Sequence, residues 1–140
     1  MTSDSKLHGN CLCGAVRVTA TPRSMNFDAC HCAMCQKWGG GPLLAVECEN
    51  DTEFEGADNI SVFDSSEWAE RGFCRQCGTH LFYRLKGGDH YAIPVGLFDR
   101  NDEWNFVEQI FIDHKPPYYA FANQTKNLTG QEVFDKFAGK

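Results

Sequence analysis

The chain has 140 residues, a formal net charge of −6 and 42% hydrophobic residues. This length predicts one folded domain with a continuous core, and the composition excludes a disordered chain. The acidic balance argues against nucleic acid as a partner, because phosphate binding needs a basic surface stripe. The chain has no run of 18 apolar residues that could span a membrane, and the N-terminus lacks the apolar region of a signal peptide. We therefore expect a cytoplasmic protein.

In chain order, the sequence predicts a polar tail at 1–8 and a single zinc-binding domain at 9–140. Short segments with β-type patterns, separated by glycine-rich turns, predict a mainly β fold of antiparallel strands. Residues 37–42 contain three glycines and a proline and are expected to form a loop. A capping-box pattern at Thr129–Glu132 predicts a short C-terminal helix with Val133, Phe134 and Phe137 on one face. The expected strands are 15–20, 43–48, 52–55, 60–63, 68–73, 79–85, 90–95 and 105–112, with a hairpin turn at 86–89.

Eight cysteines are present, and seven of them fall into three closely spaced groups. Disulfides are rare in the cytoplasm, and cysteines two or three residues apart are poor disulfide partners but good metal ligands. The eighth, Cys48, stands alone in an expected strand, where a small buried hydrophobe is its predicted role. The three groups are Cys11 and Cys13; Cys30, Cys32 and Cys35; and Cys74 and Cys77.

The densest group is the stretch from Cys30 to Cys35. In an extended segment Cys30 and Cys32 point to one side and His31 to the other, so we expect His31 to pack or support the site rather than bind metal. A tight knuckle then brings Cys35 to the same centre. Three converging thiolates need a soft cation such as zinc, and three ligands leave a fourth position open for chemistry.

Seven ligands divide into four plus three in two ways. The Cys74/Cys77 knuckle can pair with Cys11 and Cys13, which leaves Cys30, Cys32 and Cys35 as the open site. It can instead pair with Cys32 and Cys35, as in a zinc ribbon or a rubredoxin-type iron site, and this leaves the other three thiols scattered. The first division is favoured because no group of thiols is left unused. The alternative interpretation of the sequence is that every thiolate is structural.

Four motifs carry a resemblance to a known family: GNCLCG at 9–14, CHCAMC at 30–35, FCRQCGT at 73–79 and FIDHKPPYY at 111–119. They resemble the glutathione-dependent formaldehyde-activating enzyme family, which also includes centromere protein V. The resemblance implies a β-tent fold with two zinc ions: a structural ion on Cys11, Cys13, Cys74 and Cys77, and a second ion on Cys30, Cys32 and Cys35. It also implies a carbon–sulfur lyase that joins formaldehyde to glutathione, with the three ligands of the second ion in the catalytic site.

Other residues beside these motifs are candidates for substrate contacts or proton transfer. Lys37 and Arg71, with Arg75, could supply positive charge for anionic glutathione, and Trp38 could form a pocket wall. His80 and His114 are candidate proton carriers, whereas Tyr118 and Tyr119 are expected in the core. Two alternatives to the lyase stay open: a zinc module that binds glutathione or another small thiol without turnover, and a structural or interaction domain.

Overall fold

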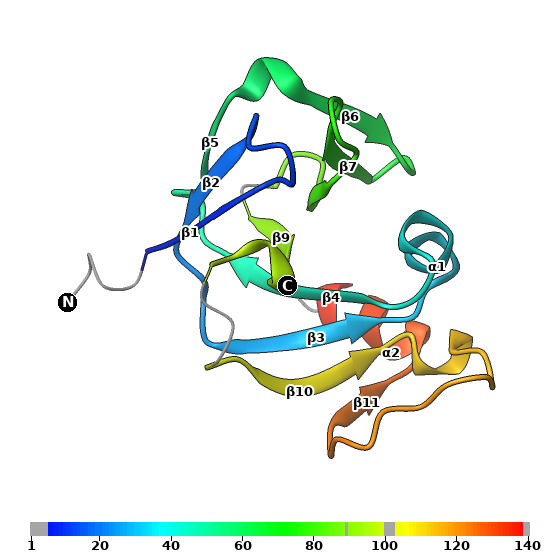
Figure 1. Ribbon diagram of the computed structural model, residues 1–140. Helices are drawn as coiled ribbons and strands as arrows, with labels where there is room; N and C mark the ends of the chain where they lie inside the picture. Colours follow the sequence, from blue (N-terminus) through cyan, green and yellow to red (C-terminus); the bar gives the residue numbers. More distant parts are fainter. Residues whose placement is uncertain (1–5, 89, 100–102, 139–140) are drawn as a thin grey trace. The chain divides into compact units, whose positions relative to one another are not determined.

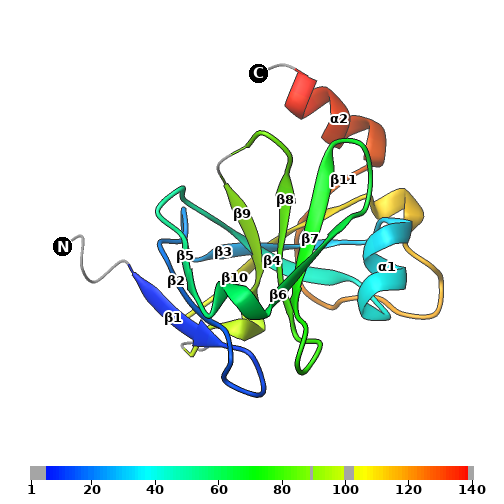
Figure 2. The same cartoon turned by 90° about the horizontal axis from the view of Figure 1, so that it is seen from above.

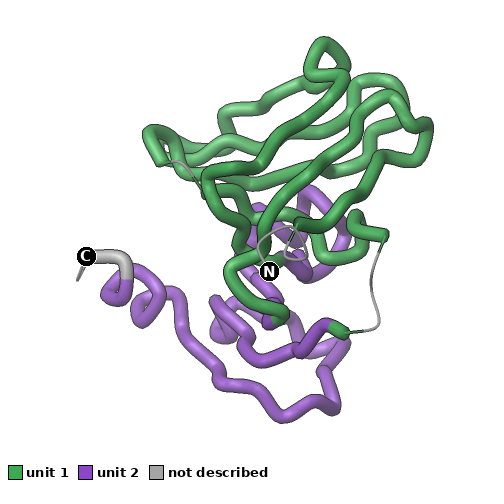
Figure 3. The backbone as a smooth tube through the Cα atoms, turned by 90° about the vertical axis from the view of Figure 1, so that its left-hand side faces the viewer, with its two compact units in different colours: residues 1–25, 46–103 green, residues 26–45, 104–140 purple. Residues whose placement is uncertain are grey.

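The computed structural model describes residues 6–88, 90–99 and 103–138. The fold is mainly β and has a C-terminal helix, both as the sequence predicts, and it contains a second α-helix that was not predicted. Two compact units make up the chain, the first from residues 1–25 and 46–103 and the second from 26–45 and 104–140 (Figure 3). Residues 1–5 of the expected tail lie outside the described residues, and the first strand already begins at Leu7. That residues 9–140 act as a single domain stays a prediction.

The first unit contains two antiparallel arrangements of strands. A three-stranded sheet has the order β1–β2–β5, and β6 to β9 follow one another as a meander (Figure 2). The predicted hairpin is confirmed, since Tyr83 of β8 pairs with Ala92 of β9, although Asp89 of its turn lies outside the described residues. The strands are β1 (Leu7–Asn10), β2 (Arg17–Ala20), β5 (Glu53–Glu55), β6 (Ile60–Asp64), β7 (Ala69–Cys74), β8 (His80–Leu85) and β9 (Tyr91–Pro94), with 3-10 turns η2 (Ala57–Asn59) and η3 (Val95–Leu97).

Apolar side chains from these strands form the core of the first unit. Val18, Leu81 and Ile93 are each at most 1% exposed. Phe54, Phe82 and Tyr91 add an aromatic cluster with ring centroids 5.0–5.5 Å apart. Full burial of side chains of this size contributes about 1.5–3 kcal/mol each.

The second unit contains a sheet with mixed strand directions. β3 (Asn26–Cys30) pairs antiparallel with the first residues of β4 (Leu43–Cys48), but parallel with β10 (Asn105–Ile110), which in turn pairs parallel with β11 (Lys126–Leu128) (Figure 1). The expectation of antiparallel strands is wrong for these two pairings. β11 was not predicted, because a strand of three residues has too little pattern to detect.

A helix, α1 (Ala33–Gly39), occupies part of the segment predicted as a loop. The prediction is wrong for Lys37, Trp38 and Gly39, which lie in the last turn of α1. Gly40 ends the helix in the left-handed conformation (φ 86°) and donates its N–H to the carbonyl of Gln36, as glycine commonly does after a helix. The glycine run therefore terminates the helix and does not prevent it.

The capping box at the start of α2 (Gly130–Ala138) is confirmed. The N–H of Glu132 donates to Thr129 Oγ1 (3.1 Å), and the N–H of Thr129 donates to Glu132 Oε1 (2.8 Å). Val133 is buried, and the ring of Phe134 packs edge-on against Phe111 at 5.8 Å. The side chain of Phe137 lies outside the described residues. Within the described part of the chain, no helix has the length and apolar character needed to cross a membrane.

Candidate metal centres

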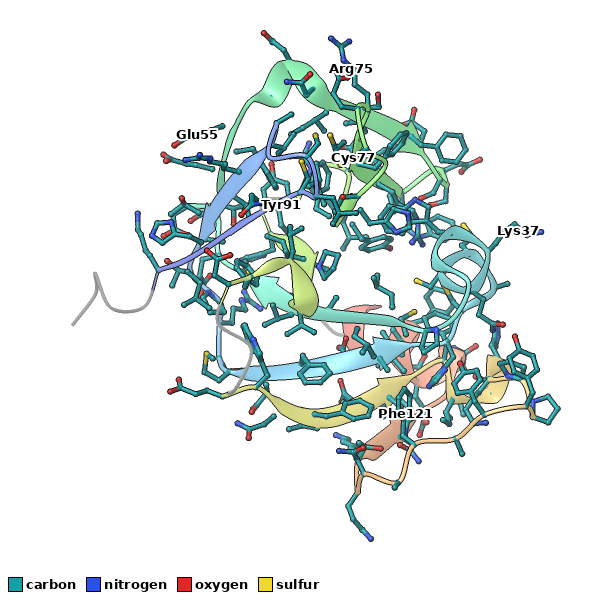
Figure 4. The ribbon with its side chains drawn as sticks, viewed as in Figure 1. Lys37, Glu55, Arg75, Cys77, Tyr91 and Phe121 are labelled. Carbon is teal, nitrogen blue, oxygen red and sulfur yellow. The ribbon has the colours of Figure 1, made fainter. Side chains whose placement is uncertain are left out.

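Four cysteines of the first unit converge on one point. The sulfur atoms of Cys11, Cys13, Cys74 and Cys77, the four-cysteine group, all lie within 4.8 Å of one another. Figure 4 shows sulfur atoms gathered beside Cys77. Cys13 Sγ lies 3.7 Å from Cys11 Sγ and 3.8 Å from Cys74 Sγ. A tetrahedron of sulfurs about 2.3 Å from a zinc ion has edges of about 3.8 Å, so these distances fit a zinc-sized cation.

Two tight turns present these sulfurs. Cys74 ends β7, and Gly78 closes the turn by donating its N–H to the Cys74 carbonyl (2.7 Å). Backbone N–H groups also point at the sulfurs: Gln76 donates to Cys74 Sγ and Val16 to Cys11 Sγ, both at 3.4 Å. Such donors favour the thiolate, which is the form that binds metal.

Thr79 connects the two turns of the four-cysteine group. Its Oγ1 accepts the N–H of Leu12 (3.1 Å) and lies 3.1 Å from Cys77 Sγ. The Thr79 hydroxyl and backbone N–H hold the pKa of Cys77 at about 5. Thr79 was not among the residues predicted from the sequence, although its place directly after the Cys74–Gly78 turn is a usable signal.

Replacement of Thr79 by valine should weaken the four-cysteine group while leaving the three-cysteine group of the second unit (Cys30, Cys32 and Cys35) unchanged. The variant loses two hydrogen bonds, each worth about 1 kcal/mol net. We expect the free energy of unfolding, measured with denaturant on metal-loaded protein, to fall by about 2 kcal/mol. Thr79→Ser keeps the hydroxyl and is the matched control; a Thr79→Val protein as stable as this control would contradict the role.

The second group of sulfurs forms where β3 meets α1. Cys30 ends β3, Cys32 caps the N-terminus of α1, and Cys35 lies in its first turn. The three sulfurs lie within 4.8 Å of one another, and the N–H of Cys35 donates to Cys32 Sγ at 3.4 Å. The predicted knuckle is thus the first turn of a helix, which the sequence analysis did not expect at this position.

Electrostatics at this three-cysteine group favour a bound cation. The adjacent sulfurs of Cys32 and Cys35, together with burial, raise the pKa of Cys30 far above its ordinary value. Three thiolates so close together repel one another, and a divalent cation between them removes that repulsion. All-sulfur donors suit zinc and other thiophilic metals.

The four-cysteine and three-cysteine groups match the first of the two divisions of the seven clustered cysteines, in which Cys74 and Cys77 pair with Cys11 and Cys13. Among the described residues, neither group includes Cys48, whose thiol is fully buried in β4. Burial, with smaller contributions from nearby carboxylates, raises the pKa of Cys48 to about 12, so this thiol stays protonated.

His31 lies between two cysteines of the three-cysteine group but makes other contacts. Its Nδ1 is 2.6 Å from the Tyr119 hydroxyl and its Nε2 is 2.8 Å from Gln109 Oε1. These contacts agree with the expectation that His31 packs within the protein or supports the site and does not bind metal. Tyr118 and Tyr119 were both expected in the core. Tyr119 is half-buried, but Tyr118 is 75% exposed, so the prediction is wrong for Tyr118. Gln109 was not predicted from the sequence; its signal is a polar residue at a buried position of a strand.

The candidate substrate-contact residues Lys37, Trp38 and Arg71 lie on two different elements, α1 and β7. Lys37 and Trp38 lie on α1 beyond Cys35; Lys37 is exposed and points away from the helix, and Trp38 is half-buried (Figure 4). Arg71 is 3% exposed, with its guanidinium 4.9 Å from the centre of the Tyr83 ring.

The two candidate proton carriers, His80 and His114, lie in different environments. Burial, and next the charge of Arg71, lower the pKa of His80, which begins β8. His114 is 46% exposed beside the Asp113 carboxylate. Arg75, in the turn between Cys74 and Cys77, is exposed (Figure 4).

Fold and site together define a mainly β protein with two cysteine clusters that could bind metal ions. Residues 6–114 match the model of a family described as "Glutathione-dependent formaldehyde-activating enzyme". The chain belongs to this family.

Three relatives illustrate the likeness. The chain is 36% identical to an uncharacterized lyase of Schizosaccharomyces pombe over 126 residues, covering 89% of this chain and 92% of that one. A Halomonas elongata protein whose name carries the family's description is 32% identical over 85 residues, which cover 54% of each chain. A solved Rhodobacter sphaeroides structure shares the fold, with a TM-score of 0.60 and 22% identity over 69% of this chain and 91% of that one.

Proposed function

We propose that this protein is a zinc-dependent carbon–sulfur lyase that acts on the adduct of a small thiol and an aldehyde. The observation that carries the proposal is the three-cysteine group, because zinc with three protein ligands keeps a position for substrate. Family membership and the lyase of Schizosaccharomyces pombe support the reaction class. The model reaction is glutathione plus formaldehyde giving S-hydroxymethylglutathione: a carbon–sulfur bond forms, and the thiol proton ends on the carbonyl oxygen.

In this proposal the two groups have different roles. Cys11, Cys13, Cys74 and Cys77 hold a structural zinc ion and close the first unit, while Cys30, Cys32 and Cys35 hold the second ion. When bound there, zinc lowers the pKa of a thiol so that it is a thiolate at neutral pH. Trp38 and the cationic Lys37, both on α1, are the proposed contacts for an anionic thiol such as glutathione. Arg71 is better placed to pack on Tyr83 than to meet a substrate.

A second candidate is a zinc module that binds a small thiol without turnover. The match to the relative from Halomonas elongata that carries the family's description covers only 54% of each chain. Segments of such relatives that have no counterpart in this chain could contribute to glutathione recognition. A structural or interaction domain is the remaining alternative.

Exchange spectroscopy tests the lyase proposal directly. With glutathione and formaldehyde at equilibrium, the zinc-loaded protein should accelerate interconversion of free and hydroxymethylated glutathione in NMR exchange measurements. Cys35→Ser should abolish the acceleration, and Cys48→Ala is the matched control that keeps it. Thiol binding without acceleration would favour the non-catalytic module, and neither binding nor acceleration would favour the structural domain.

A further inference from the structure

His31 is completely buried although its side chain is polar. Its two ring nitrogens contact the Tyr119 hydroxyl (2.6 Å) and Gln109 Oε1 (2.8 Å). An amide oxygen only accepts, so Nε2 carries the proton and donates to Gln109, while Nδ1 accepts the proton of Tyr119. Both nitrogens are therefore used within the protein, and His31 is not available as a metal ligand.

A directed chain of hydrogen bonds fixes the orientation of the Gln109 amide. Gln109 Nε2 donates to Thr125 Oγ1 (2.9 Å), and the Thr125 hydroxyl donates to Asn127 Oδ1 (2.7 Å). Gln109 lies on β10, which pairs with β3, and Asn127 lies on β11, which pairs with the other edge of β10 (Figure 1). The imidazole thus ties the segment after β3 to two further strands.

The backbone of His31 is held as firmly as its side chain. Its N–H donates to the carbonyl of Ile110 (3.1 Å), and its carbonyl accepts from Gln36 Nε2 (2.6 Å). Gln36 lies on α1, and the same Nε2 also donates to the carbonyl of His114 (3.0 Å). Four hydrogen bonds therefore fix this one residue between two cysteines.

We propose that His31 is the positioning residue of the three-cysteine group. It aims Cys30 and Cys32 at a common point through its contacts with Tyr119, Gln109, Ile110 and Gln36, and it does not touch the metal. This inference rests on the proposed function, in which the three-cysteine group holds a metal ion. Residues that orient metal ligands in this way typically change metal affinity by about 10–100-fold when they are replaced.

Cobalt titration of the full chain tests the role. Co²⁺ bound to thiolates gives intense charge-transfer bands, so metal binding at the two groups can be measured by absorbance without any measurement of activity. Tyr119→Phe removes one hydrogen bond and keeps the ring; His31→Phe removes both side-chain bonds. We expect the affinity of the three-cysteine group for Co²⁺ to fall about tenfold or more in both variants, with the four-cysteine group unchanged. Tyr118→Phe, at the exposed neighbouring tyrosine, is the matched control and should bind as the wild type does.

The possible outcomes separate the two proposals. Wild-type protein that binds Co²⁺ only at the four-cysteine group would overturn the proposed function and this inference together. Two sites in the wild type, with affinities unchanged in Tyr119→Phe and His31→Phe, would overturn the inference alone. So would an equal loss at both groups, which indicates general destabilisation. A changed cobalt spectrum in His31→Phe with unchanged affinity in Tyr119→Phe would contradict the inference by identifying His31 as a ligand.

Discussion

Cys74→Ser should produce insoluble or molten protein, whereas Cys32→Ser should remain folded. Cys74 ends β7 and belongs to the four-cysteine group, which joins the Cys11–Cys13 turn to the Cys74–Cys77 turn. A structural zinc ion contributes about 10–16 kcal/mol to folding in small zinc-binding peptides, which is comparable to the entire stability of a domain, about 5–15 kcal/mol. Cys32 belongs to the group proposed to keep an open position, so its loss should remove thiol binding instead.

Thermal denaturation and circular dichroism of the two variants measure this difference. Cys48→Ser is a useful control, because it replaces a buried thiol outside both groups and reports the cost of a serine hydroxyl in the core. Equal loss of thermal stability in Cys74→Ser and Cys32→Ser would mean that both groups are structural. The lyase proposal would then be wrong.

The zinc-loaded three-cysteine group should bind an added thiol and release about one proton per thiol at pH 7. A free thiol has a pKa near 8.5 and is mostly protonated at that pH, whereas a metal-bound thiol is deprotonated. The release should shrink at pH 9, where more of the free thiol is already ionised. Calorimetry with glutathione in two buffers of different ionisation enthalpy gives the number of protons released.

Cys48 supplies the control for this measurement. If its thiol were a fourth ligand of the second ion, thiol binding would appear only in Cys48→Ala. Its burial and its place outside both groups predict instead that wild type and Cys48→Ala bind alike. No heat with glutathione, cysteine or mercaptoethanol in either protein would contradict an open site.

The sequence was sufficient to predict those features that depend on residues close together in the chain. The strand at 43–48 has the predicted bounds, and the capping box of α2 follows from four consecutive residues. Both cysteine groups follow from spacing together with the family motifs, because ligands that share one ion must come together. The alternation of side chains in an extended segment also predicts that His31 points away from Cys30. This alternation ends beyond Cys32, where the chain turns into α1.

Contacts between distant residues could not be predicted. The partners of His31 lie 78 and 88 residues further along the chain, and no local pattern links them. The parallel pairing of β10 with β3 is equally non-local. α1 was not predicted because its seven residues lead into a run of glycines, and such a run indicates a loop. The sequence alone does not show that Gly40 acts as the cap that ends a helix.

Metal content measured during stepwise chelation tests the two-site account most directly. Elemental analysis of purified protein should give two zinc ions per chain. A chelator should first remove one ion, from the three-cysteine group, while the circular dichroism spectrum stays that of the folded protein. Removal of the second ion should unfold the chain. One metal ion per chain, iron in place of zinc, or unfolding that accompanies loss of the first ion would contradict the account.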